Sequence, residues 1–308
     1  MSLVSLVKGK GPNGFGFAST AEEVTAGRDL SGQTVLLTGC NAGLGLETLR
    51  VMARRGAHVI AAARTEAKAA AAIAAAGAGG RATAMACELS DPPSVRACAA
   101  AVRGLGRPLA AMICNAGIMA LPRLEQKQGH ELQFFTNHIG HFILVTGLVD
   151  ALADDGRVVM LSSDAHRRAP EGGIQFDNLS GAGGYRPWAA YGQSKLANLL
   201  FASELARRFA GSKRTAYSVH PGVIRTELVR HLNPAARVVF GALGPIMLKS
   251  IPQGAATQCY VATHPDAAQF SGSYFADCNP ARPSRYGRDA ELARRLWVAS
   301  EKIAAELP

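Results

Sequence analysis

Residues 34–45 read TVLLTGCNAGLG, an apolar run typical of a buried strand that opens into glycines at positions 39, 43 and 45. Glycine lets the backbone turn sharply and come close to a phosphate. A helix that begins near Leu44 would point free N–H groups and the positive end of its dipole at that phosphate. A tight turn without a ligand is the alternative, but the strand before and the helix after favour a dinucleotide-phosphate cradle. The expected cradle residues are Gly39, Gly43, Leu44 and Gly45.

Apolar runs and helical stretches alternate along the rest of the chain. Strands are expected at 34–38, 58–63, 82–87, 109–114, 157–162, 215–220 and 271–275, and helices at 44–55, 65–76, 92–103, 129–153, 189–210 and 289–307. This rhythm predicts an α/β fold, a single Rossmann-type doubly wound parallel sheet of about seven strands with helices on both faces. We expect one catalytic domain over 31–308 after an N-terminal extension over 1–30. Within the extension, Thr20 and Glu23 have capping-box spacing, which predicts a short helix.

Two long stretches interrupt the alternation, at 164–190 and 226–251. Both follow the end of an expected strand, and ligands of open α/β sheets bind outside the carboxyl ends of the strands. Long ordered loops in compact domains are usually functional. We therefore expect both stretches to form walls of a substrate pocket, with the second as a substrate-loop insertion. Its apolar run Val238–Leu248 is interpreted as a pocket lid in preference to a subunit contact or a membrane-facing patch.

The bulk composition describes a globular protein with a sizeable core. The chain has 308 residues, 48% hydrophobic and 18% charged, and a formal net charge of +10. The basic residues are scattered in pairs such as Arg54-Arg55, without interleaved aromatics, which argues against nucleic-acid binding. No run approaches the roughly 18 apolar residues of an integral membrane segment. The six cysteines show no paired spacing, so reduced thiols and a cytoplasmic location are expected.

The end of the second expected strand indicates which cofactor is preferred. Sites for NAD usually carry an acidic residue about 20 residues after the glycine loop, where it holds the ribose 2′-hydroxyl. Here the strand ends in three alanines, followed by Arg64. A guanidinium suits a 2′-phosphate, and Asn41 could add a hydrogen bond to it. We therefore expect NADP(H) in preference to NAD(H), the alternative being that Arg64 is a solvated residue at a helix start.

Tyr191 and Lys195 are the residues that indicate proton chemistry. Of the six tyrosines, only Tyr191 has a lysine four residues later. Residues at this spacing share one face of a helix. A tyrosine with a pKa of about 10 is a poor proton donor or acceptor at neutral pH, but a nearby ammonium stabilises phenolate and lowers that pKa. Tyr191 could then protonate a carbonyl or deprotonate an alcohol. A core tyrosine with a surface lysine is the alternative.

The order of motifs along the chain resembles the classical short-chain dehydrogenase/reductase family, over roughly Leu30 to Phe275. The segments that carry the resemblance are Thr38–Gly45, Asn115–Gly117, Asn137–His141, Ser162-Ser163, Tyr191 with Lys195, and Pro221–Thr226. The chain is most similar to the branch of retinol dehydrogenases, protochlorophyllide reductases and WW-domain oxidoreductases. Segments Ser162–His166, Ser194–Asn198 and Tyr274–Cys278 point to that branch.

The resemblance implies a role for four side chains. Tyr191 would be the acid/base, and Lys195 would also bind the nicotinamide ribose. Ser163 would bind the substrate oxygen, with Ser162 as the less favoured candidate. Asn137 would hold a water in a proton relay to Lys195.

The resemblance also implies further cofactor contacts. Glu88 and Leu89 would lie near the adenine, although the family often has aspartate where this chain has Glu88. The segment Asn115, Ala116 and Gly117 would lie along the cofactor. The nicotinamide end would be closed by Pro221, Gly222, Val223 and Thr226.

The leading hypothesis is an NADP(H)-dependent carbonyl reductase or alcohol dehydrogenase with an apolar small-molecule substrate. A catalytically idle NADP(H)-sensing or interaction protein is the alternative, and a cofactor-free lyase on the same fold is a third. A homodimer or homotetramer is possible. No metal is expected, because His138 and His141 have the spacing of ligands but lack a third. His166 and His220 are expected to be structural or pocket-lining, and Tyr185 and Trp188 to be packing residues or substrate contacts.

Overall fold

The computed structural model describes residues 9–224 and 248–308, which fold around an eight-stranded sheet. The strands are β1 (Thr34–Thr38), β2 (His58–Ala63), β3 (Ala82–Ala86), β4 (Leu109–Cys114), β7 (Leu152–Leu161), β8 (Thr215–His220), β9 (Tyr274–Ala276) and β10 (Asn279–Ala281). Their order is β10-β9-β8-β7-β4-β1-β2-β3, parallel throughout except that β10 pairs with β9 in the antiparallel sense. The expected Rossmann-type parallel sheet is confirmed, with β10 as an additional edge strand.

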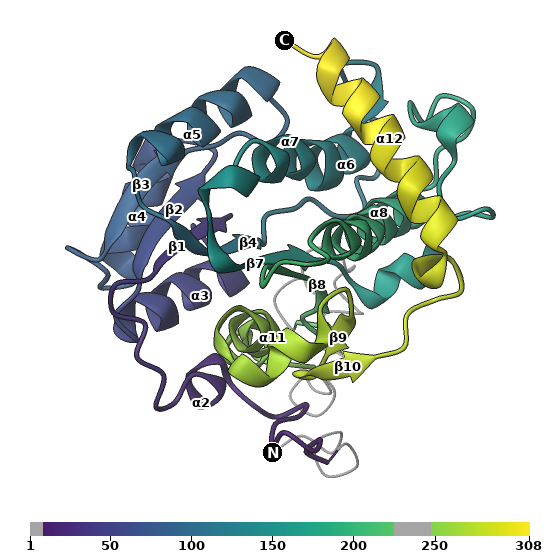
Figure 1. Cartoon of the computed structure of the whole chain (residues 1–308). Coiled ribbons are helices and arrows are strands. Elements are labelled where there is room, and N and C mark those ends of the chain that lie inside the picture. The colour runs from purple at the N-terminus through teal and green to yellow at the C-terminus, as the bar shows by residue number, and fades with distance from the viewer. Residues whose placement is uncertain (1–8, 225–247) are drawn as a thin grey trace, which may run out of the picture.

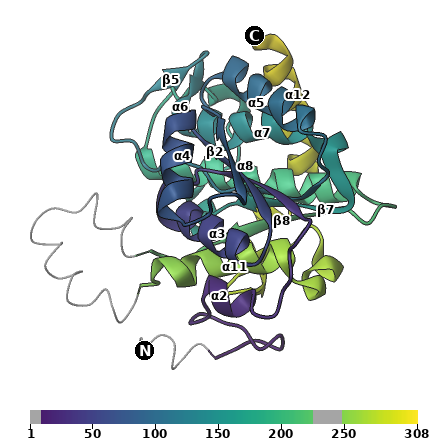
Figure 2. The same cartoon turned by 90° about the vertical axis from the view of Figure 1, so that its left-hand side faces the viewer.

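Helices cover both faces of the sheet (Figures 1 and 2). One face carries α3 (Gly43–Arg54), α4 (Glu66–Ala75) and α11 (Ile251–Thr263). The other carries α5 (Pro92–Gly104), α7 (Gly140–Thr146) and α8 (Pro187–Arg208), with α12 (Ala290–Glu306) lying on α8. Strand β1 is buried along its whole length and supplies Leu36 to one core and Val35 and Leu37 to the other. A central strand with both faces covered is apolar without alternation, as the opening sequence run is.

The single helix expected over 129–153 is wrong. A hairpin of β5 (Gln126–Lys127) and β6 (His130–Glu131) overlaps its start, and α6 (Leu132–Phe134), a π-helix (Phe135–Ile139), α7 and a 3₁₀ turn (Val149–Ala151) follow. Gly129 has a φ of 75° in the hairpin turn, so the helix cannot begin there. The Glu131 side chain caps the helix by accepting from the Phe134 N–H at 2.8 Å. Strand β7 then begins at Leu152, five residues before the expected 157, with a register shift against β4.

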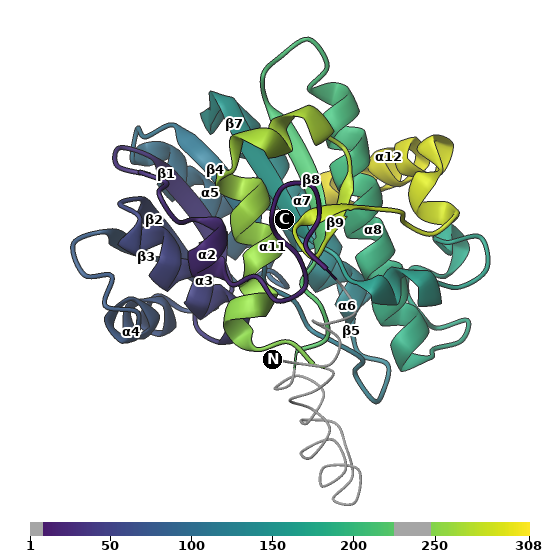
Figure 3. The same ribbon diagram turned by 90° about the horizontal axis from the view of Figure 1, so that it is seen from below.

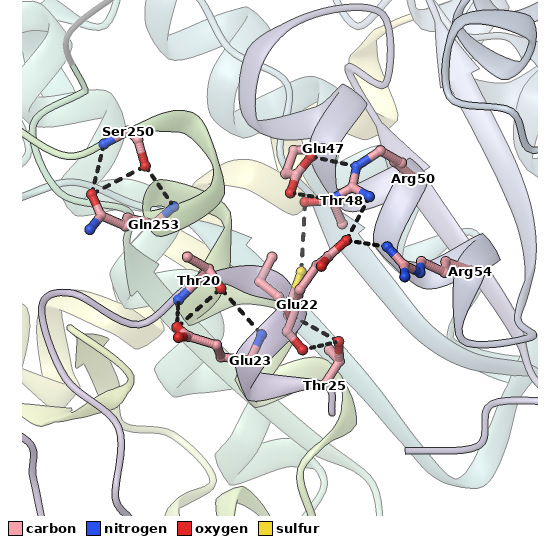
Figure 4. Close-up of polar contacts among 12 residues, drawn as sticks. Thr20, Glu22, Glu23, Thr25, Glu47, Thr48, Arg50, Arg54, Ser250 and Gln253 are labelled. Carbon is pink, nitrogen blue, oxygen red and sulfur yellow. Dashed lines mark hydrogen bonds and ion pairs between the residues drawn. The ribbon is translucent and has the colours of Figure 1, made fainter. Parts of the chain in front are cut away.

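The described chain before β1, residues 9–33, carries a short helix that packs against α3 and α11 (Figure 3). Helix α2 (Ala21–Val24) has the expected capping box, in which Thr20 and Glu23 bond each other's backbone. Glu22 lies 2.7 Å from both Arg50 and Arg54 of α3 (Figure 4). These contacts fasten α2 to the helix that follows the glycine loop. The division into an extension over 1–30 and a catalytic domain over 31–308 stays a prediction.

The two long interruptions differ in what the structure describes. The first contains 3₁₀ turns at Asp164–Arg168 and Phe176–Asn178 and then the start of α8, which begins at Pro187, two residues before the expected 189. Thr226, nearly all of the expected insertion at 226–251 and nearly all of the apolar run 238–248 lie outside the described residues. Within the described ranges, none of the helices has the length and apolar character that crossing a bilayer requires.

Candidate active site

A cavity of about 450 Å³ opens at the carboxyl ends of the central strands. Eleven residues predicted to hold a cofactor line it: Gly39, Asn41, Gly43, Leu44, Gly45, Arg64, Glu88, Leu89, Asn115, Ala116 and Gly117. The lining also includes residues that had not been singled out, namely Ala42, Ala63, Cys87, Ser90, Ile118, Leu132, Thr136, Leu161 and Ile224. Sequence positions up to about 185 residues apart, from Gly39 to Ile224, are thus brought to one edge of the sheet, as expected for an open α/β fold.

The glycine loop has the geometry of a phosphate cradle. Gly39 and Gly43 have φ values of 68° and 52°, in the region that favours glycine. A Cβ on Gly45 would lie 2.0 Å from the Gly39 carbonyl oxygen, so the first turn of α3 can approach β1 only without a side chain. The residue before α3, Ala42, makes no side-chain capping bond. The first N–H groups of the helix therefore face the cavity without a cap, which fits the pyrophosphate of a dinucleotide.

Asn115 braces this loop from the neighbouring strand. Its Nδ2 donates to the carbonyls of Thr38 at 2.9 Å and Gly39 at 3.4 Å. Its Oδ1 accepts from Nε2 of Gln258, which also donates to Oγ1 of Thr48 at 2.6 Å. Asn115 thus joins β4, the glycine loop and α11, and its buried amide is satisfied by these bonds.

Arg64 and Glu88 mark the end of the cavity formed by β2 and β3. Arg64 directly follows β2 and is exposed. The Glu88 carboxylate accepts from both the backbone N–H of Ser90 at 3.1 Å and its hydroxyl at 2.9 Å. The Glu88 side chain, which is longer than the aspartate often found here in the family, is therefore folded back onto Ser90. Both residues line the cavity.

Tyr191 and Lys195 lie on successive turns of α8 and are both buried, with exposures of 9% and 3%. Nζ of Lys195 is 5.7 Å from the centre of the Tyr191 ring and donates to the carbonyl of Leu161 at 2.9 Å. A Cβ on Gly117 would lie 3.3 Å from this Nζ. The ammonium therefore lies next to Gly117, which lines the cavity, although neither Lys195 nor Tyr191 is itself among the lining residues. It also lies beside the phenol, as the i,i+4 spacing predicts.

Asn137 connects the cavity wall to α8. It lies in the π-helix, a distortion often found at functional sites. Its Oδ1 accepts from the Ile118 N–H at 2.8 Å, and its Nδ2 donates to the Ile118 carbonyl and to Oγ of Ser194, both at 2.9 Å. Ser194 in turn donates to the Tyr191 carbonyl at 2.8 Å. The amide of Asn137 thus aligns the cavity-lining segment with the helix that carries Tyr191.

The two adjacent serines have different environments. Ser162 is buried, and its hydroxyl donates to the Lys195 carbonyl at 2.7 Å. Ser163 is half-buried, and its oxygen accepts from the Ala165 N–H at 3.2 Å, which leaves its hydroxyl proton for another acceptor. His166 donates from Nδ1 to the Ser163 carbonyl at 2.7 Å, since a carbonyl can only accept. The geometry is consistent with Ser163 as the preferred partner of a substrate oxygen, and it gives His166 a structural role.

The segment after β8 reaches the cavity at Ile224. Pro221 and Gly222 precede Val223, which is 48% exposed, and Ile224 lines the cavity. Gly222 has a φ of 95°. Of the residues expected to close this end, Pro221, Gly222 and Val223 directly precede Ile224 in the chain but are not themselves among the lining residues, whereas Thr226 lies outside the described residues.

Several residues whose role the sequence left open make contacts within the protein. His138 lies 2.7 Å from Ser300, and His141 bonds Thr38 and Asn137, so both rings are engaged in the interior. The Tyr185 hydroxyl donates to the Leu121 carbonyl at 2.6 Å. Trp188 is 42% exposed, with its ring 6.1 Å from that of Tyr191 in an edge-to-face contact. Trp188 therefore flanks the phenol, while Tyr185 is held by the backbone.

Comparison with known proteins identifies the family. A family model described as short chain dehydrogenase matches residues 33–237. The chain is 42% identical to "Short-chain dehydrogenase TIC 32 A, chloroplastic" of Brassica napus, over all of both chains. It is 40% identical to retinol dehydrogenase 12 of Mus musculus, covering 90% of this chain and 87% of the relative. It is 36% identical to the WW domain-containing oxidoreductase of Homo sapiens, covering 94% and 72%.

Solved structures agree with these relatives. A crystal structure of an uncharacterized protein from Mycobacterium Paratuberculosis superposes with a TM-score of 0.74 at 35% identity, covering 92% of this chain and 98% of that one. The resemblance inferred from the motifs, including its branch, is confirmed. The chain belongs to the short-chain dehydrogenase family and is an oxidoreductase that acts on alcohol or carbonyl groups with a nicotinamide cofactor.

Proposed function

We propose that this protein is an NADP(H)-dependent carbonyl reductase or alcohol dehydrogenase of an apolar small molecule, with Tyr191 as the acid/base. The observation that carries the proposal is the position of Lys195. Its ammonium lies next to Gly117, a residue of the cavity lining, and 5.7 Å from the centre of the Tyr191 ring. A protein that only senses a nucleotide needs the glycine loop but not this buried ammonium beside a phenol.

The residues at the cavity fit the cofactor that the family uses. The glycine loop would hold the pyrophosphate, because a Cβ on Gly45 would collide with the backbone of Gly39 and no capping side chain blocks the first turn of α3. Lys195 would bind the nicotinamide ribose, and Pro221, Gly222, Val223 and Thr226 would lie at the nicotinamide. A bound nicotinamide supplies or accepts the hydride.

The protein's own groups handle the proton. In reduction, the Tyr191 hydroxyl would protonate the substrate oxygen, and the Lys195 ammonium would stabilise the phenolate that remains. The Ser163 hydroxyl would donate a hydrogen bond to the same substrate oxygen and orient it, while keeping its proton. Asn137 would hold a water in a relay that returns a proton to the phenolate through Lys195. Oxidation of an alcohol would use the same groups in reverse.

Arg64 supports the preference for NADP(H). It is exposed at the cavity directly after β2, where the preceding residues Ala61–Ala63 offer no carboxylate to a ribose 2′-hydroxyl. A guanidinium can bind a 2′-phosphate through charge-assisted hydrogen bonds.

An apolar substrate fits the surroundings of Tyr191. Trp188 and Val223 are among the few large apolar side chains that are substantially exposed within the described ranges, and Trp188 touches Tyr191. The relative named retinol dehydrogenase 12 has by its name an apolar alcohol as substrate. We also propose a cytoplasmic location, which suits six free cysteines, and a homodimer or homotetramer.

The test is oxidation of NADPH and of NADH over a panel of apolar aldehydes and ketones, with Tyr191→Phe assayed alongside. Turnover with NADPH that disappears in Tyr191→Phe, while NADPH binding persists, is the expected result. Tyr217→Phe is the matched control, because Tyr217 is buried in β8 and bonds Ala267 away from the cavity. Turnover that survives in Tyr191→Phe would refute the mechanism. A panel without turnover, with NADPH still bound, would favour the sensing alternative.

A further inference from the structure

Lys249 is a fully buried lysine for which the proposed chemistry has no use. Its side chain has an exposure of 0%, and its Nζ lies 2.7 Å from Oδ1 of Asp277. Lysine is almost never fully buried unless it is paired, because removing an ammonium from water is costly. Such a pair therefore needs a reason other than stability, and the reason can be sought in what the two side chains touch.

The backbone that presents Asp277 is strained. Asp277 and Cys278 form the two-residue turn between β9 and β10, with φ values of 51° and 62°. Hairpin turns with two positive φ values strongly prefer Asn-Gly, and Cys278 has a side chain in that region. The turn is held in place by its neighbours, because Cys278 donates its N–H to Thr257 at 3.2 Å and accepts from Asn13 at 2.7 Å. The carboxylate is thus fixed by a conformation that the surrounding structure enforces.

Lys249 is joined to the segment at the Ile224 end of the cavity. Its N–H donates to the Val223 carbonyl at 2.9 Å, and it forms a parallel bridge with Ile224. A Cβ on Gly222 would lie 2.6 Å from Cδ of Lys249. The aliphatic stem of Lys249 therefore occupies the space that Gly222 leaves by lacking a side chain. Lys249 thus contacts the segment Gly222–Ile224, and Ile224 in turn lines the cavity.

Phe17 and Ala18, which precede α2, pack against Lys249 and the start of α11. The Phe17 ring centre is 5.1 Å from Nζ of Lys249. Gln253, in the first turn of α11, donates to the Ala18 carbonyl at 3.2 Å. An aromatic face near an ammonium is favourable when water is excluded. The segment thereby helps to shield the Lys249 ammonium from solvent, whereas the Asp277 side chain stays 22% exposed.

We propose that Lys249 and Asp277 are positioning residues that set the nicotinamide-side wall of the cavity, Pro221–Ile224. This inference rests on the proposed function, in which that wall receives the nicotinamide. The strained turn fixes Asp277, Asp277 fixes the ammonium, and the stem and backbone of Lys249 fix Gly222 and Val223. The pair acts on the nicotinamide half of the cofactor and leaves the adenine half, at Arg64 and Ser90, undisturbed.

The experiment compares two ligands in the full-length protein by isothermal titration calorimetry. NADP⁺ reaches both ends of the cavity, whereas adenosine 2′,5′-bisphosphate can occupy only the adenine end. Asp277→Asn removes the charge while asparagine still tolerates a positive φ. We expect the Kd of Asp277→Asn for NADP⁺ to rise by at least about tenfold, with its Kd for the bisphosphate within about twofold of wild type.

The double variant Lys249→Met/Asp277→Asn tests the reason for this effect. It removes both charges but keeps an unbranched stem against Gly222, so we expect it to recover most of the NADP⁺ affinity. Glu204→Gln is the matched control, because Glu204 is a nearly fully buried carboxylate paired with Arg207 on the last turns of α8. It should lower thermal stability without changing the ratio of the two Kd values.

The outcomes separate this inference from the function on which it rests. Wild-type protein that binds no NADP⁺ would overturn the proposed function and the inference together. Wild-type binding with an unchanged NADP⁺ affinity in Asp277→Asn would overturn the inference alone. A parallel loss of both ligands in that variant would also overturn it, because the pair would then stabilise the fold without setting the nicotinamide side.

Discussion

The hydroxyl oxygen of Thr38 lies 2.9 Å from Nε2 of His141, which joins the end of β1 to α7 beneath the glycine loop. Nδ1 of His141 is 2.9 Å from the Asn137 carbonyl, which can only accept, so the ring proton is on Nδ1 and Nε2 is the acceptor. Thr38 therefore donates to His141, and its oxygen accepts from the Ala116 N–H at 3.1 Å. One hydroxyl thus links the cofactor loop, the π-helix of Asn137 and the segment after β4.

Thr38→Val removes this hydroxyl with almost no change in shape. It would leave Nε2 of His141 and the N–H of Ala116 without their partner, and unsatisfied buried polar groups cost about 1–3 kcal/mol each. We expect the free energy of unfolding, measured by urea denaturation, to fall by about 2–4 kcal/mol. Thr38→Ser keeps the hydroxyl and should lose about 1 kcal/mol for its missing methyl group. Equal losses in the two variants would contradict the hydrogen-bond account.

The two buried histidines predict an acid-sensitive fold. Burial lowers the pKa of His138 to about 3 and that of His141 to about 4. The unfolded chain takes up protons at these positions as the pH falls below about 6.5, and the folded chain does not, so the folded state loses stability on acidification. Each histidine should contribute a loss of about 2–3 kcal/mol between about pH 7 and pH 4.5.

The measurement is urea denaturation of wild type and of His138→Phe at several pH values. His138 is surrounded by Phe134, Phe142 and Phe201, so a phenylalanine fits the chemistry of its site, although it removes the contact with Ser300. The variant should show a shallower loss of stability than wild type between about pH 6.5 and pH 4.5. Identical slopes would mean that His138 titrates alike in both states. Carboxylates contribute equally to both proteins and cancel in this comparison.

The sheet and much of the cavity could be predicted because their signals are local. The run from Thr34 to Gly45 contains a strand, a turn that needs glycine and a helix start, and each element follows from neighbouring residues. The spacing of Tyr191 and Lys195 likewise reports their position on one helix. All the cofactor residues expected before position 120 line one cavity, because the carboxyl ends of parallel strands share an edge.

What could not be predicted depends on contacts between distant segments. The hydrogen bond between Thr38 and His141 joins residues 103 positions apart, and no local sequence pattern predicts it. The hairpin and the π-helix that replace the expected helix over 129–153 contain apolar residues at spacings that also suit an α-helix. Gly129, which has a positive φ in the hairpin turn, is the residue in the sequence that argues against a helix start there. The pairing of the buried Lys249 with Asp277 has the same origin, since a charged residue in a sequence is ordinarily solvated.

Lys195→Met tests the proposed role of the ammonium. We expect kcat to fall by about 10²–10⁴-fold, the range that positioned proton transfer contributes. The fold should survive, because Asn198 also donates to the Leu161 carbonyl at 3.1 Å and the methionine stem fills the space of the lysine. Steady-state kinetics with NADPH and far-ultraviolet circular dichroism check the two statements. Lys213→Met, at an exposed lysine after α8, is the control and should keep the wild-type kcat.

Arg64→Ser tests the proposed preference for NADP(H). Hydrogen bonds to charged groups contribute about 1.5–3 kcal/mol, so kcat/KM for NADPH should fall by about 10–100-fold while the value for NADH changes little. The control is Arg107→Ser, an exposed arginine just before β4 and therefore at the opposite edge of the sheet. A variant that loses NADPH and NADH activity in the same proportion would show that Arg64 does not read the 2′-phosphate.

Gly45→Ala tests the fit of the glycine loop to a phosphate. The new Cβ would lie 2.0 Å from the Gly39 carbonyl oxygen and 2.8 Å from Nδ2 of Asn115, so the first turn of α3 must move away from β1. Overpacking of this kind costs about 1–3 kcal/mol, and the displaced loop should bind NADPH at least about tenfold more weakly. Gly104→Ala is matched in chemistry, because Gly104 ends α5 with open space around it. It should leave NADPH affinity unchanged and raise stability by up to about 1 kcal/mol, since alanine restricts the unfolded chain. Titration of NADPH by fluorescence checks both variants, and wild-type affinity in Gly45→Ala would show that the close approach of α3 to β1 is not what shapes the phosphate site.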